Sequence, residues 1–277
     1  MAGRRGVLPG FGLALGTTLV YLTLLVLVPL AALVARSAGL GPRDIWEVVT
    51  TPRALAAFKL SLGAAGLAAA INGVAGLLLA WVLERCPFPG RGVVDALVDL
   101  PFALPTAVAG IALATVWGAD GWLGRFTTAA GLEVVYTPAA VVLALVFVGL
   151  PFTVRSVQPV LRDLDPALEE AAASLGAGAV RSFLRVVLPE LVPALSTGVV
   201  LALARGLGEY GSVIFVAGNM PLRSEITPLL IMIQLEQYDY GRATAIALVF
   251  LLLSLLLLLP LNLLARWRGR TLATELG

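Results

Sequence analysis

The sequence predicts an all-α polytopic membrane protein with six transmembrane helices. Of its 277 residues, 59% are hydrophobic and only 13% are charged, whereas an ordinary soluble domain carries about 25% charged residues. Uncharged runs recur along the chain, and each approaches the length of about 20 residues that an α-helix needs to cross a bilayer. The expected spans, all within a single transmembrane domain covering residues 1–277, are residues 11–35, 60–83, 97–117, 138–158, 191–216 and 243–265.

The residue types that are missing exclude most catalytic chemistry. The chain has no histidine and one cysteine, Cys86, so it cannot form a Ser-His-Asp triad, an HExxH zinc site or an internal disulfide. Its one lysine, Lys59, follows a phenylalanine, whereas a P-loop needs the sequence GK[ST]. We therefore expect no catalytic residue, no metal site and no cofactor bound by this chain. If ATP drives the protein, a partner subunit hydrolyses it.

The first span, 11–35, follows two arginines, Arg4 and Arg5. Its uncharged run is longer than the roughly 7 to 15 residues of a signal-peptide core, so we expect it to remain in the protein as a span. The polar stretch that follows predicts a short interfacial helix over residues 44–49. The second span, 60–83, is rich in glycines, which favour close packing against neighbouring helices.

Prolines mark the third and fourth spans. Pro101 and Pro105 predict a break in the third span, 97–117, because each proline removes a backbone donor and the freed carbonyl groups need a protein or water partner. We therefore expect this helix to face the interior of the bundle and to line a pathway. Pro151 is likewise expected to break the fourth span, 138–158.

The longest charged interruption, residues 162–189, predicts two short helices around a glycine turn. Asp165 and the proline after it open the first helix, because Asp caps free N–H groups and Pro fits the first turn. Gly176 and its small neighbours interrupt the helix, and Pro189 is expected to end a second helix over residues 180–187. We expect this element to lie at the membrane face and to bind a partner.

The spacing within this segment matches a family pattern. Bacterial ABC importer permeases carry a cytoplasmic loop that reads E-A-A, three residues, G, nine residues, I, one residue, L-P. The chain fits every position, with valine in place of isoleucine, through Glu170, Ala171, Ala172, Gly176, Val186, Leu188 and Pro189. The chain therefore resembles these permeases, and the resemblance implies a coupling helix pair that docks on an ATP-hydrolysing subunit. The alternative is an ordinary helical hairpin, because a motif match alone carries a false-positive risk.

The basic residues predict the orientation of the chain. Six spans put both termini on one side of the membrane, and more of the 19 Lys and Arg residues fall on the side of segment 162–189 than on the other. Because cytoplasmic loops are enriched in Lys and Arg, we expect both termini and this segment to be cytoplasmic. Between the fifth and sixth spans, residues 227–235 are too few to cross and predict a re-entrant or surface helix.

Two ionisable residues, Arg205 and Glu209, lie inside the fifth span, one helical turn apart. A charge at the bilayer centre costs about 2.5 to 3.5 kcal/mol on insertion scales, so such residues face the bundle interior or a wet cavity. We therefore expect this turn, with Gly208 and Ser212, to lie on the translocation pathway. Two interpretations stay open: a buried ion pair that only fixes packing, or a gate whose field acts on an anion.

Further stretches resemble the sulfate/thiosulfate (CysT-type) permeases, namely DLPFALPTAVAG, LVFVGLPFTVRSVQPVL, ARGLGEYGSVIFVAGNMPLRSEI and LIMIQLEQYDYGRATAIA. This resemblance implies a type I ABC importer permease fold in the bacterial inner membrane. The implied partners are a homologous CysW-type permease or a second copy of the chain, two ATPase subunits that use ATP and Mg, and a periplasmic sulfate-binding protein. The alternatives are a permease for molybdate or tungstate, or an ion-coupled secondary transporter, which should show more midplane carboxylates.

Overall fold

The structure is a computed structural model that describes the backbone of residues 10–275 and the side chains of residues 10–263. Every regular element within that part of the chain is helical, as predicted. The helices long and apolar enough to cross a membrane are Phe11–Ala38, Pro52–Arg85, Pro138–Asp163, Ala179–Leu207 and Tyr240–Leu263. The third predicted span is broken into pieces. The described residues therefore contain five long helices where six spans were predicted, and the third predicted span is a run of shorter helices.

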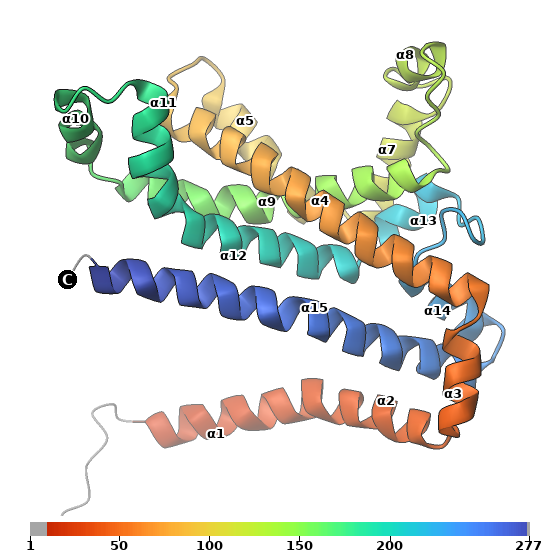
Figure 1. Cartoon of the computed structure of the whole chain (residues 1–277). Helices are drawn as coiled ribbons and strands as arrows, with labels where there is room; N and C mark the ends of the chain where they lie inside the picture. Colours follow the sequence, from red (N-terminus) through yellow and green to blue (C-terminus); the bar gives the residue numbers. More distant parts are fainter. Residues whose placement is uncertain (1–9, 276–277) are drawn as a thin grey trace, which may run out of the picture.

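Four helices run side by side along the bundle (Figure 1): α4 (Pro52–Arg85), α9 (Pro138–Asp163), α12 (Leu188–Leu207) and α15 (Tyr240–Glu275). At one end of the bundle, which we call the α10 end, lie α10 (Pro166–Ser174), α11 (Ala179–Ser182), the beginning of α1 and the last turns of α15. At the other, the α14 end, lie α3 (Pro42–Val49), α8 (Gly124–Ala129), α13 (Gly211–Ala217) and α14 (Thr227–Glu236). The predicted interfacial helix (44–49) and short helix (227–235) correspond to α3 and α14.

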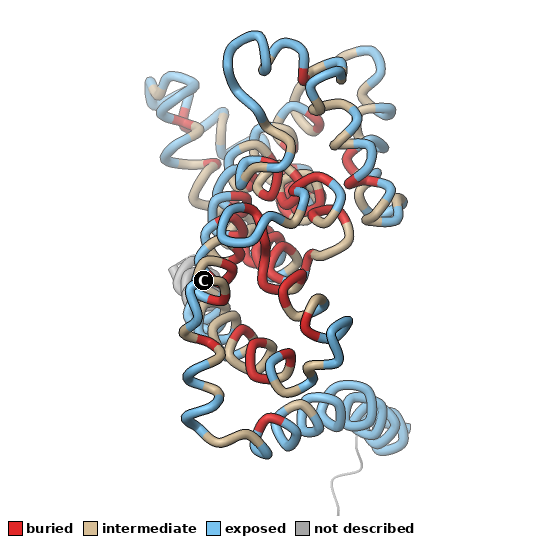
Figure 2. The backbone as a smooth tube through the Cα atoms, turned by 90° about the vertical axis from the view of Figure 1, so that its right-hand side faces the viewer, coloured by how far each residue is buried: buried red, intermediate tan, exposed pale blue. Residues whose placement is uncertain are grey.

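The first apolar helix stands apart from the rest of the bundle. It comprises α1 (Phe11–Leu22), a π-helical turn η1 (Thr23–Leu27) and α2 (Val28–Ala38). Figure 2 shows its coil almost entirely exposed. Ser37 is its buried residue, and the Ser37 hydroxyl donates a hydrogen bond to the Thr244 carbonyl oxygen of α15 at 3.3 Å. This helix is therefore anchored to the bundle near its end, where α2 contacts α15.

Prolines inside helices explain two wrong predictions. Pro189 does not end a helix, because α11, the π-helical turn η2 (Phe183–Val187) and α12 run on as one helix. The Leu188 N–H bonds to the Phe183 carbonyl, five residues earlier, and this wider turn makes room for a residue that lacks an N–H and whose ring would clash with a carbonyl. Pro29 follows η1 in the same way. Pro151 is buried in the continuous helix α9, where neighbouring helices hold the chain in place.

Two of the predicted spans, the third and the fifth, are interrupted. The third predicted span, 97–117, includes the end of α5 (Arg91–Val98), α6 (Leu100–Ala103) and α7 (Thr106–Trp117), and the chain is extended at Leu104 before Pro105. The break predicted from Pro101 and Pro105 is therefore confirmed. The fifth predicted span, 191–216, is corrected, because α12 ends at Leu207 and the chain resumes as α13. The glycine-rich sequence at 206–211 permits this interruption.

Small residues bring α4, α9 and α12 into close contact. A Cβ atom added to Gly76 of α4 would lie 2.7 Å from the Thr153 Cβ of α9, and one added to Gly198 of α12 would lie 2.7 Å from the Thr153 Cα. Three helices thus meet around one threonine, a geometry that only residues without a side chain allow.

Gly76→Ala is therefore expected to destabilise the protein, because a methyl group forced into a packed interior costs about 1 to 3 kcal/mol. Gly63→Ala on the same helix is the matched control, because nothing lies within 4 Å of its added Cβ and alanine favours a helix by about 1 kcal/mol over glycine. Thermal unfolding in detergent should show a Tm lowered by several degrees for Gly76→Ala and unchanged or raised for Gly63→Ala. Equal Tm values would contradict this packing.

Candidate coupling element and translocation pathway

The segment predicted to couple to a partner folds as two helices around a glycine turn. The Asp165 carboxylate accepts a hydrogen bond from the Ala167 N–H at 2.9 Å and caps α10. Gly176 ends that helix with φ +82°, a left-handed conformation that disfavours any residue with a side chain. The second helix, predicted over residues 180–187, is the first part of a helix that continues to Leu207. The segment is therefore joined rigidly to a membrane-crossing helix.

The motif residues are divided between the surface and the interior of this element. Glu170, Ala171 and Gly176 are exposed, Ala172 is buried, and Val186, Leu188 and Pro189 are half-buried. Apolar side chains beside them face solvent, and Leu175 and Val180 are 89% and 74% exposed. Two arginines, Arg181 and Arg185, line a shallow groove on the same surface. An exposed apolar patch with a charged rim is typical of a protein interaction site.

The breaks in the third and fifth spans lie against each other. A Cβ atom added to Gly110 of α7 would overlap the Ser212 backbone of α13, and one added to Gly211 would overlap the Thr106 hydroxyl. Helices α7 and α13 therefore begin side by side, each directly after an interruption of a crossing segment. In membrane proteins, non-helical backbone at such depth is tolerated only where it is buried in protein or lines a water-filled cavity.

Arg205, Glu209 and Ser212 contact one another at this junction. The contact between Arg205 and Glu209 agrees with their predicted spacing of one helical turn. An Arg205 guanidinium N–H contacts the Glu209 carboxylate at 2.6 Å, and the Glu209 side chain is only 1% exposed. The same carboxylate accepts the Ser212 N–H at 2.9 Å and the Ser212 hydroxyl at 2.8 Å. Gly208 is the capping residue directly after the end of α12. The buried charge is thus fully partnered, while Arg205, at 34% exposure, remains accessible.

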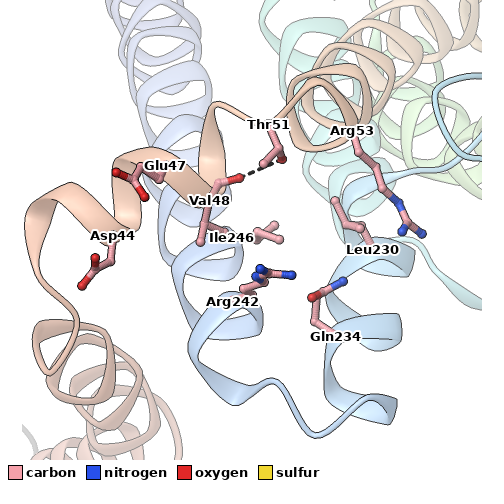
Figure 3. A pocket seen from close by; sticks show the side chains of 9 residues that line it. All are labelled: Asp44, Glu47, Val48, Thr51, Arg53, Leu230, Gln234, Arg242 and Ile246. Carbon is pink, nitrogen blue, oxygen red and sulfur yellow. Dashed lines mark hydrogen bonds between the residues drawn. The ribbon is translucent and has the colours of Figure 1, made fainter.

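A cavity of about 370 Å³ lies at the α14 end, between α3, α4, α14 and α15 (Figure 3). Arg53 lines it and forms a two-fold hydrogen bond with Glu225 at 2.7 and 2.6 Å. Arg242 also lines it and contacts Asp239 at 3.4 Å. Because both arginines are neutralised by carboxylates, this cavity does not offer a free cationic site to an anion.

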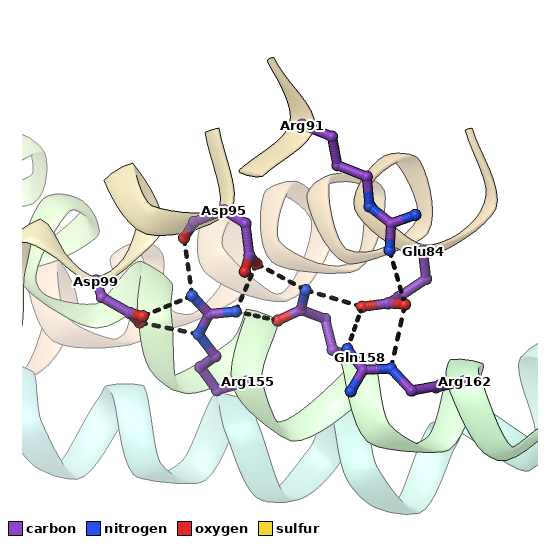
Figure 4. Close-up of polar contacts among 7 residues, drawn as sticks. All are labelled: Glu84, Arg91, Asp95, Asp99, Arg155, Gln158 and Arg162. Atoms are coloured by element: carbon purple, nitrogen blue, oxygen red, sulfur yellow. Dashed lines mark hydrogen bonds and ion pairs between the residues drawn. The ribbon is translucent and has the colours of Figure 1, made fainter. Parts of the chain in front are cut away.

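Sequence reasoning missed a polar network at the α10 end, drawn in Figure 4. Arg155 of α9 donates to the Asp95 carboxylate at 2.6 Å and to both Asp99 oxygens at 2.8 and 2.6 Å. Gln158 donates to Asp95 at 3.0 Å. The Gln158 hydrogen bond, followed by that of Arg155, lowers the pKa of Asp95. The partners lie about 60 residues apart in the chain, so no local pattern links them. The network holds the break between α5 and α6 against α9.

No group of three or more His, Cys, Asp and Glu side chains within the described residues could hold a metal ion. The site brings together an exposed surface of apolar and charged residues at the α10 end, an ion pair at a helix break, and polar networks that connect the two interrupted segments to continuous helices.

Comparison with known proteins agrees with this description. Residues 72–272 match a family described as binding-protein-dependent transport system inner membrane component. The sulfate transport system permease protein CysT of Salmonella typhimurium is 50% identical over 236 residues, which are 85% of each chain. The CysT protein of Synechocystis sp. is 48% identical over 258 residues, covering 93% of this chain and 90% of that one.

Solved structures show the same fold. A bacterial ABC transporter involved in the import of the acidic polysaccharide alginate matches with a TM-score of 0.73 and 20% identity, covering 91% of this chain and 93% of that one. The MetNI methionine ABC transporter matches with a TM-score of 0.52 and 19% identity over 84% of this chain and 99% of that one. The fold is that of an ABC importer permease, and the chain belongs to the family of binding-protein-dependent transport system inner membrane components.

Proposed function

We propose that this chain is a permease subunit of an ATP-driven importer of sulfate and thiosulfate in a bacterial inner membrane. The substrate assignment rests on sequence identity. About half of the aligned residues are identical to those of proteins named sulfate transport system permeases, and the alignments cover 85% or more of both chains. The subunit is a transport component rather than an enzyme, and it binds no cofactor. ATP and Mg are used by two partner ATPase subunits.

The assembly we propose follows from the two ends of the bundle. The α10 end, with the beginning of α1 and the last turns of α15, faces the cytoplasm, and an ATPase subunit docks on the exposed surface around Glu170, Gly176 and Val180. The α14 end faces the periplasm and receives a sulfate-binding protein. A homologous CysW-type permease, or a second copy of this chain, completes the pathway. The support is that α10 and α11 lie at the end of the bundle opposite α3 and α14 (Figure 1).

The pathway we propose runs past the facing breaks of the third and fifth spans. Pro101 and Pro105 interrupt one side, and Gly208 interrupts the other. Arg205 lies there with its charge neutralised by Glu209. Such a pair can close the pathway electrostatically without trapping a divalent anion, because a free buried cation would bind sulfate tightly and slow its release. Ser212 holds the Glu209 carboxylate in position.

The substrate is tested by uptake of labelled sulfate into a bacterial strain that lacks its own sulfate transporter and expresses this chain with its partners. We expect uptake that depends on ATP and on the binding protein, and that excess thiosulfate inhibits at least tenfold more strongly than excess molybdate. The control is the same strain with the permease omitted. Inhibition by molybdate or tungstate at lower concentration than by thiosulfate would reassign the substrate to those oxyanions.

A further inference from the structure

The last turn of α4 makes a contact that the coupling motif does not include. Helix α10 packs mainly on α11 and η2. Its polar contact with α4 is an ion pair between the Arg85 guanidinium and the Glu169 carboxylate, 3.0 Å apart. The Arg85 Nε and Nη2 atoms and the Glu169 Oε1 atom are shielded from solvent and form no hydrogen bond within the described residues, so the pair is a contact between opposite charges without hydrogen-bond geometry. Each charge therefore depends on the other.

Aromatic packing fixes the position of Arg85. The Arg85 guanidinium lies 5.7 Å from the centre of the Trp81 ring, one turn earlier on α4. The Trp81 ring meets the Phe183 ring of η2 edge to face, with 5.0 Å between centroids. A cation over an aromatic face and an edge-to-face aromatic pair are both attractive. The end of α4 is therefore held by both halves of the coupling element.

The residue next to Arg85 extends this contact into the bundle. The Glu84 side chain is only 6% exposed and accepts from Arg91 of α5 at 3.1 Å, and from Gln158 and Arg162 of α9 at 3.1 and 2.9 Å. Figure 4 shows these three donors converging on Glu84. Because α5 leads into the broken third span, one turn of α4 links α10 to that span.

We propose that Arg85 is a positioning residue that transmits movement of α10 to α4 and, through Glu84, to the discontinuous third span. The proposal rests on the proposed function, in which α10 follows the ATPase. The ion pair and the Trp81 contact make α10 and the end of α4 move as one body. Without these contacts, movement of the docking surface would pass directly only to α12, because α11, η2 and α12 form one helix. The third span would then move only through packing contacts between helices.

The test uses the complete complex in proteoliposomes, with ATP hydrolysis measured with and without loaded binding protein, together with sulfate uptake. Arg85→Gln is expected to lower stimulation by the binding protein at least fivefold, with basal hydrolysis and co-purification of the ATPase within twofold of the unaltered complex. Arg85→Lys, which keeps the charge, should retain at least half of the stimulation. The double variant R85E/E169R, which exchanges the two charges, should show more stimulation than the single variants R85E and E169R. Asp163→Asn is the control at the same end of the bundle, because Asp163 is the last residue of α9, is exposed and forms no ion pair within residues 10–263.

Normal stimulation in Arg85→Gln would overturn the proposal. The proposal would also be overturned if Arg85→Gln lost co-purification of the ATPase to an extent that explains the whole defect, and R85E/E169R recovered no stimulation. Arg85 would then only support the fold. An error in the substrate assignment would give a different result. The unaltered complex would then be stimulated by its binding protein but would take up a different anion. The role of Arg85 would still be tested by comparing ATP hydrolysis between the variants and the unaltered complex.

Discussion

Glu170→Ala is expected to lower hydrolysis stimulated by the binding protein at least tenfold while leaving the permease folded and inserted. The Glu170 side chain is exposed, and it forms no ion pair or side-chain hydrogen bond within residues 10–263. Alanine is the best helix former, so α10 should persist. A loss of activity would then come from a missing contact with the ATPase. Removing one partner of a charged interface contact costs about 2 to 5 kcal/mol, which is ample for a tenfold effect.

The measurement is ATP hydrolysis by the reconstituted complex with and without loaded binding protein, and the control is Asp163→Ala. Asp163 is also an exposed acidic residue at the α10 end, but it is the last residue of α9 and lies outside α10 and the motif. Gly176→Val should give the same loss as Glu170→Ala, because the φ of +82° at Gly176 is strained for a β-branched residue. Normal stimulation in Glu170→Ala would show that α10 is not the coupling helix.

The sequence was a good guide wherever a local pattern determines structure. Hydropathy located the membrane-crossing segments, the Asp165 cap and Gly176 located α10, and the spacing of Arg205 and Glu209 predicted their ion pair. In each case the residues that interact lie within about one or two helical turns of each other, so the local sequence is sufficient to predict the structure. Whether the motif residues and the paired charges act in coupling and transport stays a prediction.

Prolines show where local reasoning failed. A proline ends or kinks a helix by default, yet α9 continues through Pro151 and the helix after α11 continues through Pro189. The outcome depends on packing around Pro151 and on a π-helical turn before Pro189. Neither feature has a local sequence signature. The same limit applies to Arg155, because its partners on α5 lie about 60 residues away in the chain and are set by tertiary contact.

Arg205→Ala is expected to reduce sulfate uptake at least tenfold and also to reduce the amount of folded permease. The reason is that Glu209 is 1% exposed, and removing one member of a buried ion pair leaves an uncompensated charge at a cost of about 3 to 5 kcal/mol. Only the Ser212 N–H and hydroxyl would remain as partners of the carboxylate. Uptake alone cannot distinguish a gate from a packing device, because both would fail in this variant.

The double variant R205Q/E209Q separates the two roles. It removes both charges together and keeps groups of similar size that can hydrogen-bond each other, so the folded amount, measured by size-exclusion chromatography in detergent, should return to normal. If the pair is a gate, sulfate uptake per folded permease should stay at least tenfold low, because the neutral pair no longer provides a field for the anion. Recovery of uptake together with folding would assign the pair to packing alone. Ser212→Ala is the control within the site: it removes one hydrogen bond to the Glu209 carboxylate and keeps the ion pair, so it should lower the free energy of unfolding by about 1.5 to 3 kcal/mol.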